Sequence, residues 1–222
     1  TIRVHAIGMN PADVKYPTRP GASYPFPIGY EVSGEITAIG PDTVIGSGPA
    51  AIGDAVLAFR LSGGYATELT IPAEKAFAKP ANLDHPAAAN LFLAGATAAE
   101  LLELSRAERG DTVLFHAASG AVGVSFLQQA AVRGVRVVGT ASERNADVVR
   151  RYGGIPIAYG PGLVERAKDA AGGAPFVAAL DGVGTDEAID ASLELVADRA
   201  RIITIVRRDL EAYGIVAIGG ML

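Results

Sequence analysis

The segment T-V-L-F-H-A-A-S-G-A-V-G, residues 112–123, decides the fold of this chain. It begins as an apolar run without charge, which is typical of a strand buried on both faces of a parallel sheet. A short turn with two glycines follows, and apolar residues then recur at helical spacing at Val122, Phe126 and Ala130. A buried strand, a tight turn and an amphipathic helix in this order predict the first unit of a doubly wound α/β domain.

The same alternation continues toward the end of the chain. Apolar runs alternate with runs at helical spacing, and strands are expected at residues 112–116, 135–140, 155–159, 176–181 and 202–206. Because these runs are almost continuously apolar, they predict a doubly wound parallel α/β sheet with helices on both faces.

The first 80 residues have a different period. Short runs alternate apolar and polar residues between Gly-rich and Pro-rich turns, as in residues 32–38 and 65–71. This pattern predicts β-rich structure with one face in solvent, toward which Ser33 and Glu35 point.

A helical run separates the two parts. We expect one helix from Asp84 to Arg106, with Asp84 as its N-cap and Pro86 in its first turn. The domain boundary is therefore placed here, with domains at 1–84 and 85–222.

Composition excludes several classes of function. The 222 residues carry 19 Lys and Arg against 24 Asp and Glu, a net charge of −5, and no Cys. Half of the residues are hydrophobic, which favours a packed core over disorder. The absence of Cys excludes disulfides, thiolate zinc sites and a cysteine nucleophile. Without a cluster of Lys and Arg, a nucleic-acid partner is not expected.

The chain shows no targeting segment, and a cytoplasmic protein is expected. Residues 112–132 are uncharged and long enough to span a bilayer, but they include His116, two Ser and two Gln. We therefore expect neither a membrane span nor a membrane partner.

The turn after the first α/β strand predicts a dinucleotide site. The three small positions of the G-x-G-x-x-G fingerprint fall on Ala118, Gly120 and Gly123. They allow a tight turn, close approach of the pyrophosphate and contact between helix and strand, and the helix N-terminus faces the phosphates. An ordinary strand-to-helix turn is the alternative. The expected cofactor-binding residues here are Ala118, Ser119, Gly120, Ala121, Val122 and Gly123.

The end of the second strand distinguishes NADPH from NADH. An NAD-selective site places Asp or Glu there, whereas Ser142, Arg144 and Asn145 donate hydrogen bonds to a 2′-phosphate. Glu143 opposes this assignment if its side chain turns toward the ribose. We expect it to face water on the first helical turn, and predict NADPH as the cofactor.

Several blocks resemble the zinc-independent quinone oxidoreductase branch of the medium-chain dehydrogenase/reductase superfamily. They are N-P-A-D-V-K at 10–15, P-I-G-Y-E-V-S-G at 27–34, G-D-A-V at 53–56, G-G-Y-A-T-E at 63–68, L-A-G-A-T-A at 93–98 and H-A-A-S-G-A-V-G at 116–123. The resemblance implies a GroES-like β domain joined to the Rossmann domain, with NADPH in the cleft between them. It also implies a strand before Thr1 and a segment after Leu222 that completes the sheet.

The resemblance assigns further residues to the cofactor. Thr97 corresponds to a threonine near the nicotinamide, and Tyr159 to a tyrosine beside the 2′-phosphate. The residues that would line the nicotinamide pocket are Val183, Gly184, Ile205 and Val206.

The same blocks predict no metal site. Zinc-dependent relatives carry a Cys in the first block and a His-Glu pair in the second, where this chain has Met9-Asn10 and Tyr30-Glu31. Glu31 alone cannot provide the ligand set of a tetrahedral zinc.

Without a metal, the substrate oxygen needs hydrogen-bond donors. Asn10 is the best candidate, with Tyr30 as a second, and these two are the expected catalytic residues. The alternatives are that Asn10 only bonds its own turn and that Tyr30 only packs. Asp13 and Lys15 are expected to be solvated surface charges.

The three histidines are expected to be structural. His116 is a possible catalytic base because it adjoins the glycine turn. The preferred interpretation is a core imidazole that bonds the backbone. We interpret His5 and His85 in the same way.

The resulting hypothesis is a cytoplasmic oxidoreductase, acting as a homodimer, that transfers hydride from NADPH to a small-molecule quinone or α,β-unsaturated carbonyl compound. The alternatives are an NADPH-binding structural or sensing protein without turnover and an enoyl-reductase module of a larger synthase.

Overall fold

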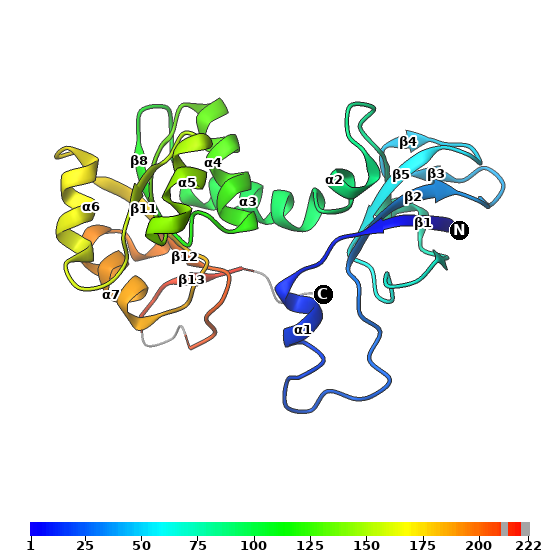
Figure 1. Ribbon diagram of the computed structural model, residues 1–222, viewed down its shortest axis with the longest axis horizontal. Coiled ribbons are helices and arrows are strands. Elements are labelled where there is room, and N and C mark those ends of the chain that lie inside the picture. Colours follow the sequence, from blue (N-terminus) through cyan, green and yellow to red (C-terminus); the bar gives the residue numbers. More distant parts are fainter. Residues whose placement is uncertain (210–212, 219–222) are drawn as a thin grey trace. The chain divides into compact units, whose positions relative to one another are not determined.

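The computed structural model describes residues 1–209 and 213–218. The chain divides into two compact units (Figure 1). We call Thr1–Leu93 the N-terminal unit and Ala94–Met221 the C-terminal unit.

The N-terminal unit is built on an antiparallel five-stranded sheet. Its strand order is β6-β1-β2-β5-β7, and β3 and β4 form a separate two-stranded ribbon. The strands are β1 (Ile2–Ile7), β2 (Glu31–Ile36), β3 (Val44–Ile45), β4 (Gly48–Pro49), β5 (Ala55–Phe59), β6 (Glu68–Leu69) and β7 (Ala76–Ala78). Of the run at 65–71 that we expected to be extended, only the two residues of β6 are strand.

Strand β2 differs from the prediction of one solvated face. Val32 and Ile36 enter the apolar core as expected, but Ser33 on the other face is also fully buried. Its hydroxyl donates to Val56 O at 3.0 Å and bonds His85 Nδ1 at 2.8 Å. The reason is that β2 is the middle strand of the sheet and a helix, α2 (His85–Ala89), contacts it.

The histidines of this unit also differ from the prediction. His5 is exposed, and its ring stacks on that of His85 with 4.6 Å between centroids. The partner of His85 is the Ser33 side chain rather than the backbone.

The expected helix from Asp84 to Arg106 is two helices. Asp84 is confirmed as an N-cap, since its Oδ1 accepts from Ala87 N at 2.9 Å. However, α2 ends at Ala89, Asn90 leaves the helical region (φ −103°, ψ 8°), and α3 runs from Phe92 to Ser105. The remaining helices of this unit are α1 (Pro11–Lys15) and η1 (Ala73–Lys75).

The C-terminal unit has the predicted parallel sheet. Its order is β10-β9-β8-β11-β12-β13, which is the doubly wound arrangement in which the strand order reverses at β8. The strands are β8 (Thr112–His116), β9 (Arg136–Thr140), β10 (Ile155–Ile157), β11 (Phe176–Asp181), β12 (Ile202–Thr204) and β13 (Val216–Ala217). The sequence pattern missed β13, which has only two residues.

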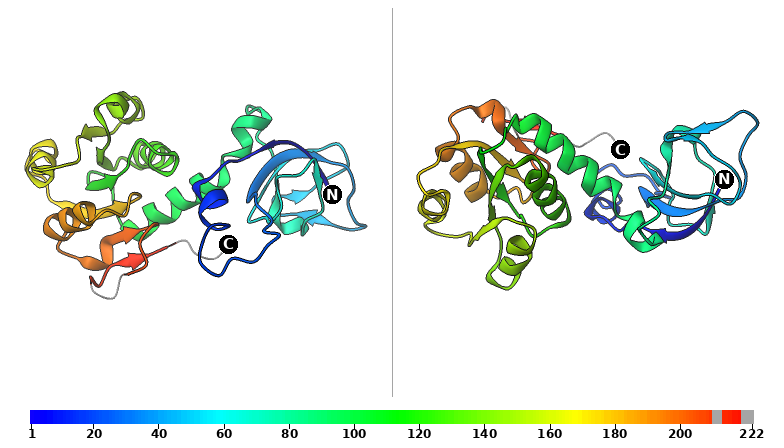
Figure 2. Two further views of the ribbon diagram at one scale, coloured as in Figure 1. Left: turned by 60° about the horizontal axis from the view of Figure 1, so that its bottom comes forward. Right: turned by 90° about the horizontal axis from the view of Figure 1, so that it is seen from above.

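Helices cover both faces of this sheet (Figure 2). Phe115 of β8 packs on one side with residues of α3, α4 and α5. Leu114, its neighbour, packs on the opposite side with residues of α6 and α7. The helices are α4 (Ala121–Arg133), α5 (Ala146–Arg151), α6 (Leu163–Ala171) and α7 (Asp186–Leu195), with short turns η2 (Glu143–Asn145) and η3 (Arg199–Arg201).

The predicted fold class is therefore confirmed: a parallel α/β sheet with helices on both faces and a separate β-rich unit. Among the described residues, no helix combines the length and the apolar character that crossing a bilayer requires.

Candidate functional site

The turn between β8 and α4 is shaped by contacts of Ala118. Its N–H donates to Thr140 O at 3.0 Å, and Ala117 N donates to Thr140 Oγ1 at 3.0 Å. The turn is thereby tied to the end of β9. Ala118 occupies the first fingerprint position, and its methyl group packs against Gly139 of β9. A Cβ at Gly139 would lie only 2.4 Å from the Ala118 Cβ, so the methyl group fits because residue 139 has no side chain. Gly139 and this role of Thr140 in holding the turn were not predicted from the sequence.

Gly123 has the close contact that the fingerprint requires. A Cβ at this position would lie 2.5 Å from Ala118 O and 2.6 Å from Ala118 C, which are backbone atoms. Only glycine therefore allows the start of α4 to approach the backbone of Ala118 this closely.

The N-terminus of α4 presents free backbone donors. The first i→i−4 hydrogen bond of the helix runs from Val124 N to Gly120 O, at 2.8 Å. The N–H groups of Ala121, Val122 and Gly123 lie before it in the first turn, where a helix provides no carbonyl acceptor for them. The N-cap is Gly120, which has no side chain to bond them. These donors and the positive end of the helix dipole suit a phosphate.

The end of β9 carries a polar group without a partner. Ser142 Oγ is buried, and no hydrogen-bond partner is found for it among the described residues. Arg144 is exposed and Asn145 half-buried on the adjoining η2. A buried hydroxyl without a partner, two residues before an exposed arginine, is consistent with a site for the 2′-phosphate of NADPH. Glu143, also exposed on η2, stays the opposing residue.

Tyr159 follows the neighbouring strand. Ala141 N donates to Ile157 O at 3.0 Å, so β10 runs beside the end of β9, and Tyr159 lies two residues farther along at the same sheet edge. Its side chain is exposed.

Asp181 organises the loop after β11. It is fully buried, and its Oδ1 accepts from Val183 N at 2.9 Å and from Gly184 N at 2.8 Å, while Oδ2 accepts from Thr204 Oγ1 at 2.7 Å. The loop is therefore joined to the end of β12. A Cβ at Gly184 would lie 3.0 Å from Val206 Cγ1, so these two predicted residues are neighbours.

His116 is a buried imidazole, as expected, but its partner is a side chain. Its Nε2 lies 3.1 Å from Ser192 Oγ, and that hydroxyl donates to Ala188 O at 2.7 Å. His116 therefore donates from Nε2. Burial lowers the pKa of His116 to about 4, and the nearby Asp181 opposes this shift only partly. A neutral, enclosed ring is a poor candidate for a general base.

The predicted cofactor residues thus meet at one edge of the sheet. They follow the carboxyl ends of β8, β9, β10, β11 and β12, which in a parallel sheet all lie at the same edge. Thr97 is half-buried on α3. Whether each residue contacts a cofactor stays a prediction.

In the N-terminal unit, Asn10 is held by two carboxylates. Its Nδ2 donates to Glu31 Oε1 at 2.9 Å, and its backbone N donates to Asp13 Oδ2 at 2.7 Å. The expectation that Asp13 is a solvated charge is wrong, because it is buried and also accepts from Gly29 N at 3.0 Å. Lys15 is exposed, as expected. These roles of Asp13 and Glu31 were not predicted from the sequence.

Tyr30 carries a second polar group without a partner. Only 4% of the residue is exposed, its ring meets that of Tyr16 edge-on, and no partner of its hydroxyl is found in the part of the chain that the structure describes. Burial, with the charge of Asp13, raises the pKa of Tyr30. The phenol is therefore protonated at neutral pH and keeps a hydrogen to donate.

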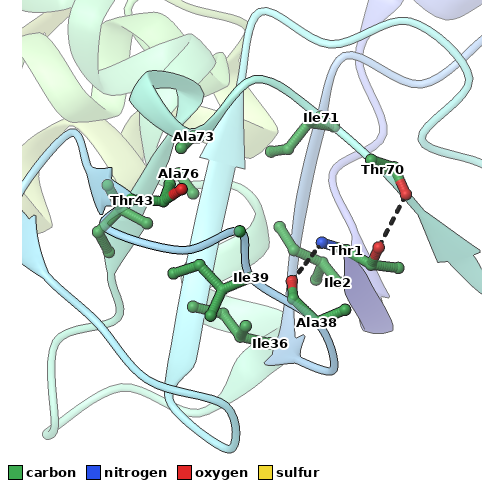
Figure 3. Close-up of a pocket in the computed structure, with 12 residues that line it drawn as sticks. Thr1, Ile2, Ile36, Ala38, Ile39, Thr43, Thr70, Ile71, Ala73 and Ala76 are labelled. Carbon is green, nitrogen blue, oxygen red and sulfur yellow. Dashed lines mark hydrogen bonds between the residues drawn. The ribbon is translucent and has the colours of Figure 1, made fainter.

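A cavity of about 410 Å³ lies elsewhere in this unit (Figure 3). Its lining includes Thr1, Ile36, Ile39 and Ile71, and Thr1 Oγ1 bonds Thr70 Oγ1 at 2.8 Å on its wall. The lining offers no titratable side chain and includes none of the predicted site residues.

No three metal-binding side chains gather among the described residues. The absence of a zinc site stays a prediction.

Residues 1–81 match the Alcohol dehydrogenase GroES-like domain family. The chain is 31% identical over 210 residues to a quinone oxidoreductase of Pseudomonas aeruginosa; this covers 91% of the chain but 63% of that protein. The chain therefore spans less than two thirds of that relative.

Two solved structures are also similar. A mycobacterial quinone oxidoreductase has 31% identity and a TM-score of 0.80, and the match covers 99% of this chain and 72% of that one. The Escherichia coli quinone oxidoreductase complexed with NADPH has 26% identity and a TM-score of 0.84, with 99% and 71% covered.

Proposed function

Because this chain belongs to the quinone oxidoreductase branch of the medium-chain dehydrogenase/reductase superfamily, we propose that it is an NADPH-dependent oxidoreductase. The observation that carries the proposal is the β8–α4 turn, where Gly123 allows the open helix N-terminus to approach Ala118. NADPH in the complex of the Escherichia coli relative supports the choice of cofactor.

Each group of residues has a defined task in this proposal. The first-turn N–H groups of α4 bind the pyrophosphate, and Ser142 and Arg144 bind the 2′-phosphate. NADPH supplies the hydride. The Asn10 amide and the Tyr30 hydroxyl donate hydrogen bonds to the substrate oxygen, on which negative charge develops.

The proposed substrate class is a quinone or an α,β-unsaturated carbonyl compound. Both accept hydride at carbon while negative charge develops on oxygen. In an enone, hydride adds to the β-carbon and a proton at the α-carbon gives the saturated carbonyl compound. A quinone takes up one hydride and one proton, and a further proton shift from the reduced carbon to the second oxygen gives the hydroquinone. The N–H and O–H donors suit this charge because their hydrogen bonds to the oxygen become stronger as negative charge develops on it in the transition state. Zinc has no part in this scheme.

Cofactor preference tests the assignment of the 2′-phosphate site. We expect NADPH to bind more tightly than NADH, and Arg144→Ala to remove most of this preference while NADH affinity is unchanged. Fluorescence titration of both cofactors measures this. Arg150→Ala is the matched control, since Arg150 is an exposed arginine nearby on α5 that bonds Asp147. Equal affinity of the wild-type protein for both cofactors would show that Glu143 faces the ribose, and would refute the assignment.

Turnover separates the proposal from its alternatives. NADPH oxidation should depend on added quinone or enone, and the products should be hydroquinone or saturated ketone. Binding of NADPH without turnover of any substrate would favour a structural or sensing role. Turnover of an enoyl thioester alone would favour an enoyl-reductase module.

A further inference from the structure

Glu31 is a buried carboxylate for which the proposed function has no task so far. Only 2% of the residue is exposed. Within residues 1–209 and 213–218, no Lys, Arg or His side chain forms an ion pair with it. A buried carboxylate without a counter-ion costs free energy, so its retention requires a physical reason.

Both oxygens of Glu31 accept hydrogen bonds. Oε1 accepts from Asn10 Nδ2 at 2.9 Å, and Oε2 accepts from Leu93 N at 2.8 Å. Leu93 is the second residue of α3, and Phe92 N, in the same turn, donates as well. Burial raises the pKa of Glu31, and the hydrogen bonds from Asn10 and from the first turn of α3 oppose this shift. Each of these contacts requires an acceptor, which the carboxylate in its ionised form provides on both oxygens.

Neighbouring backbone encloses the side chain. A Cβ at Gly8 would lie 2.4 Å from Glu31 Cγ and 2.5 Å from Oε1, so only glycine fits beside the carboxylate. Gly8 N also donates to Glu31 O at 3.0 Å. The carboxylate is therefore fixed between Gly8 on one side and the first turn of α3 on the other.

This contact determines how the Asn10 amide is oriented. An amide can present either its oxygen or its NH₂ group in a given direction, and a carboxylate accepts only from NH₂. One N–H of Asn10 is used by Glu31, and the second N–H of the same group remains for another acceptor.

We propose that Glu31 is a positioning residue that holds the Asn10 amide with its free N–H directed to the substrate oxygen. The part that concerns the substrate rests on the proposed function; the contact itself does not.

Glu31→Gln is the informative substitution. Glutamine keeps the shape of the side chain but offers one oxygen and one NH₂ group to donors on both sides. If the oxygen stays with Leu93 N, the NH₂ group faces Asn10, and the Asn10 amide turns over to accept. Its N–H groups then point away from the substrate position. Glu35→Gln, a half-exposed carboxylate on the same strand, is the matched control.

The first test is NMR of the side-chain amides, which needs no turnover. The chain has only four Asn (Asn10, Asn82, Asn90 and Asn145) and two Gln, so few signals must be assigned. In the wild-type protein we expect the bonded hydrogen of Asn10 to exchange with solvent at least about tenfold more slowly than those of exposed Asn82. Glu31→Gln should remove this protection, and Glu35→Gln should not. Equal exchange of Asn10 and Asn82 in the wild-type protein overturns the proposal even if the variant does not fold.

The second test is a double-mutant cycle in NADPH oxidation. Loss of one donor to a developing oxyanion lowers kcat by about 10²-fold or more, so Asn10→Ala should have this effect and Glu31→Gln at least about a tenfold one, with little change in KM. In the Asn10→Ala background, Glu31→Gln should change kcat by less than about twofold, because both act through one amide. The same loss in both backgrounds would indicate a merely structural role and overturn the proposal.

The two tests separate the two proposals. If the wild-type protein turns over no substrate, the proposed function fails, while amide exchange still decides whether Glu31 holds Asn10.

Discussion

Single atoms decide the geometry of the β8–α4 turn. Gly123 has a hydrogen where other residues have a Cβ. A Cβ at this position would lie 2.5 Å from Ala118 O, which is too close, so the observed backbone contact requires glycine. The contact is with backbone, which cannot rotate away as a side chain can. The position of the α4 N-terminus therefore depends on the absence of a side chain at this residue.

Gly123→Val tests this dependence. Overpacking of this kind costs about 1–3 kcal/mol or moves the backbone, and either outcome shifts the N–H groups that we propose for the pyrophosphate. NADPH affinity should fall by about tenfold or more in a variant that remains folded. Thermal unfolding and NADPH titration of the same sample measure both effects.

Gly95→Ala is the control for this variant. Gly95 lies in α3, and a Cβ there would meet nothing closer than Ser125 Oγ at 3.8 Å. Alanine should raise stability slightly and leave NADPH affinity unchanged. Unchanged NADPH affinity in folded Gly123→Val would mean that the turn does not hold the pyrophosphate.

At the scale of elements, α2 shows how a short helix is maintained. It has five residues, too few for a stable helix on its own, and Ala88 and Ala89 are buried. Asp84 caps its first turn through Ala87 N. The cap and the packing of the two alanines therefore determine together whether this helix forms.

Asp84→Ala should lower the free energy of unfolding by about 1 kcal/mol, because Ala87 N loses its acceptor. Asp84→Asn keeps an oxygen in place and should cost much less. Denaturant unfolding of the three proteins measures the difference. An equal loss for both substitutions would indicate that the charge, and not the cap, is what matters.

At the scale of the whole molecule, the buried His116 makes stability depend on pH. The unfolded chain takes up a proton on this ring near pH 6.5, whereas burial lowers the folded pKa to about 4. Between these values the unfolded state binds more protons than the folded state. The contribution of a neutral His116 is therefore complete above pH 6.5 and is lost as pH falls toward 4.

From pH 7 to pH 5, this one group should lower the free energy of unfolding by about 2 kcal/mol. His116→Gln cannot take up the proton and should show a correspondingly smaller loss over the same interval. Denaturant unfolding at both pH values gives the comparison. Identical losses in the two proteins would show that His116 is not the group responsible.

The fold class could be predicted from the sequence because the spacing of apolar residues along each strand and helix of the C-terminal unit indicates which of its faces are buried. The uncharged run at 112–116 is buried on both faces as β8. Small residues at 118, 120 and 123 predicted the turn, since their spacing is a local property of the backbone. The cap at Asp84 was predictable for the same reason.

Only the tertiary structure decided which polar groups are buried and which partners they have. Asp13, expected in solvent, is buried because Gly29 N and Asn10 N reach it from other segments. Glu31 accepts hydrogen bonds from Asn10, 21 residues away in the chain, and from Leu93 at the start of α3, 62 residues away. The expected single helix is interrupted, and α3 starts at Phe92 with its first-turn N–H groups at that carboxylate. A periodic pattern reports which face of an element is apolar. It contains no information about which donor a distant element brings to a carboxylate, and that pairing decides whether the charge is buried or solvated.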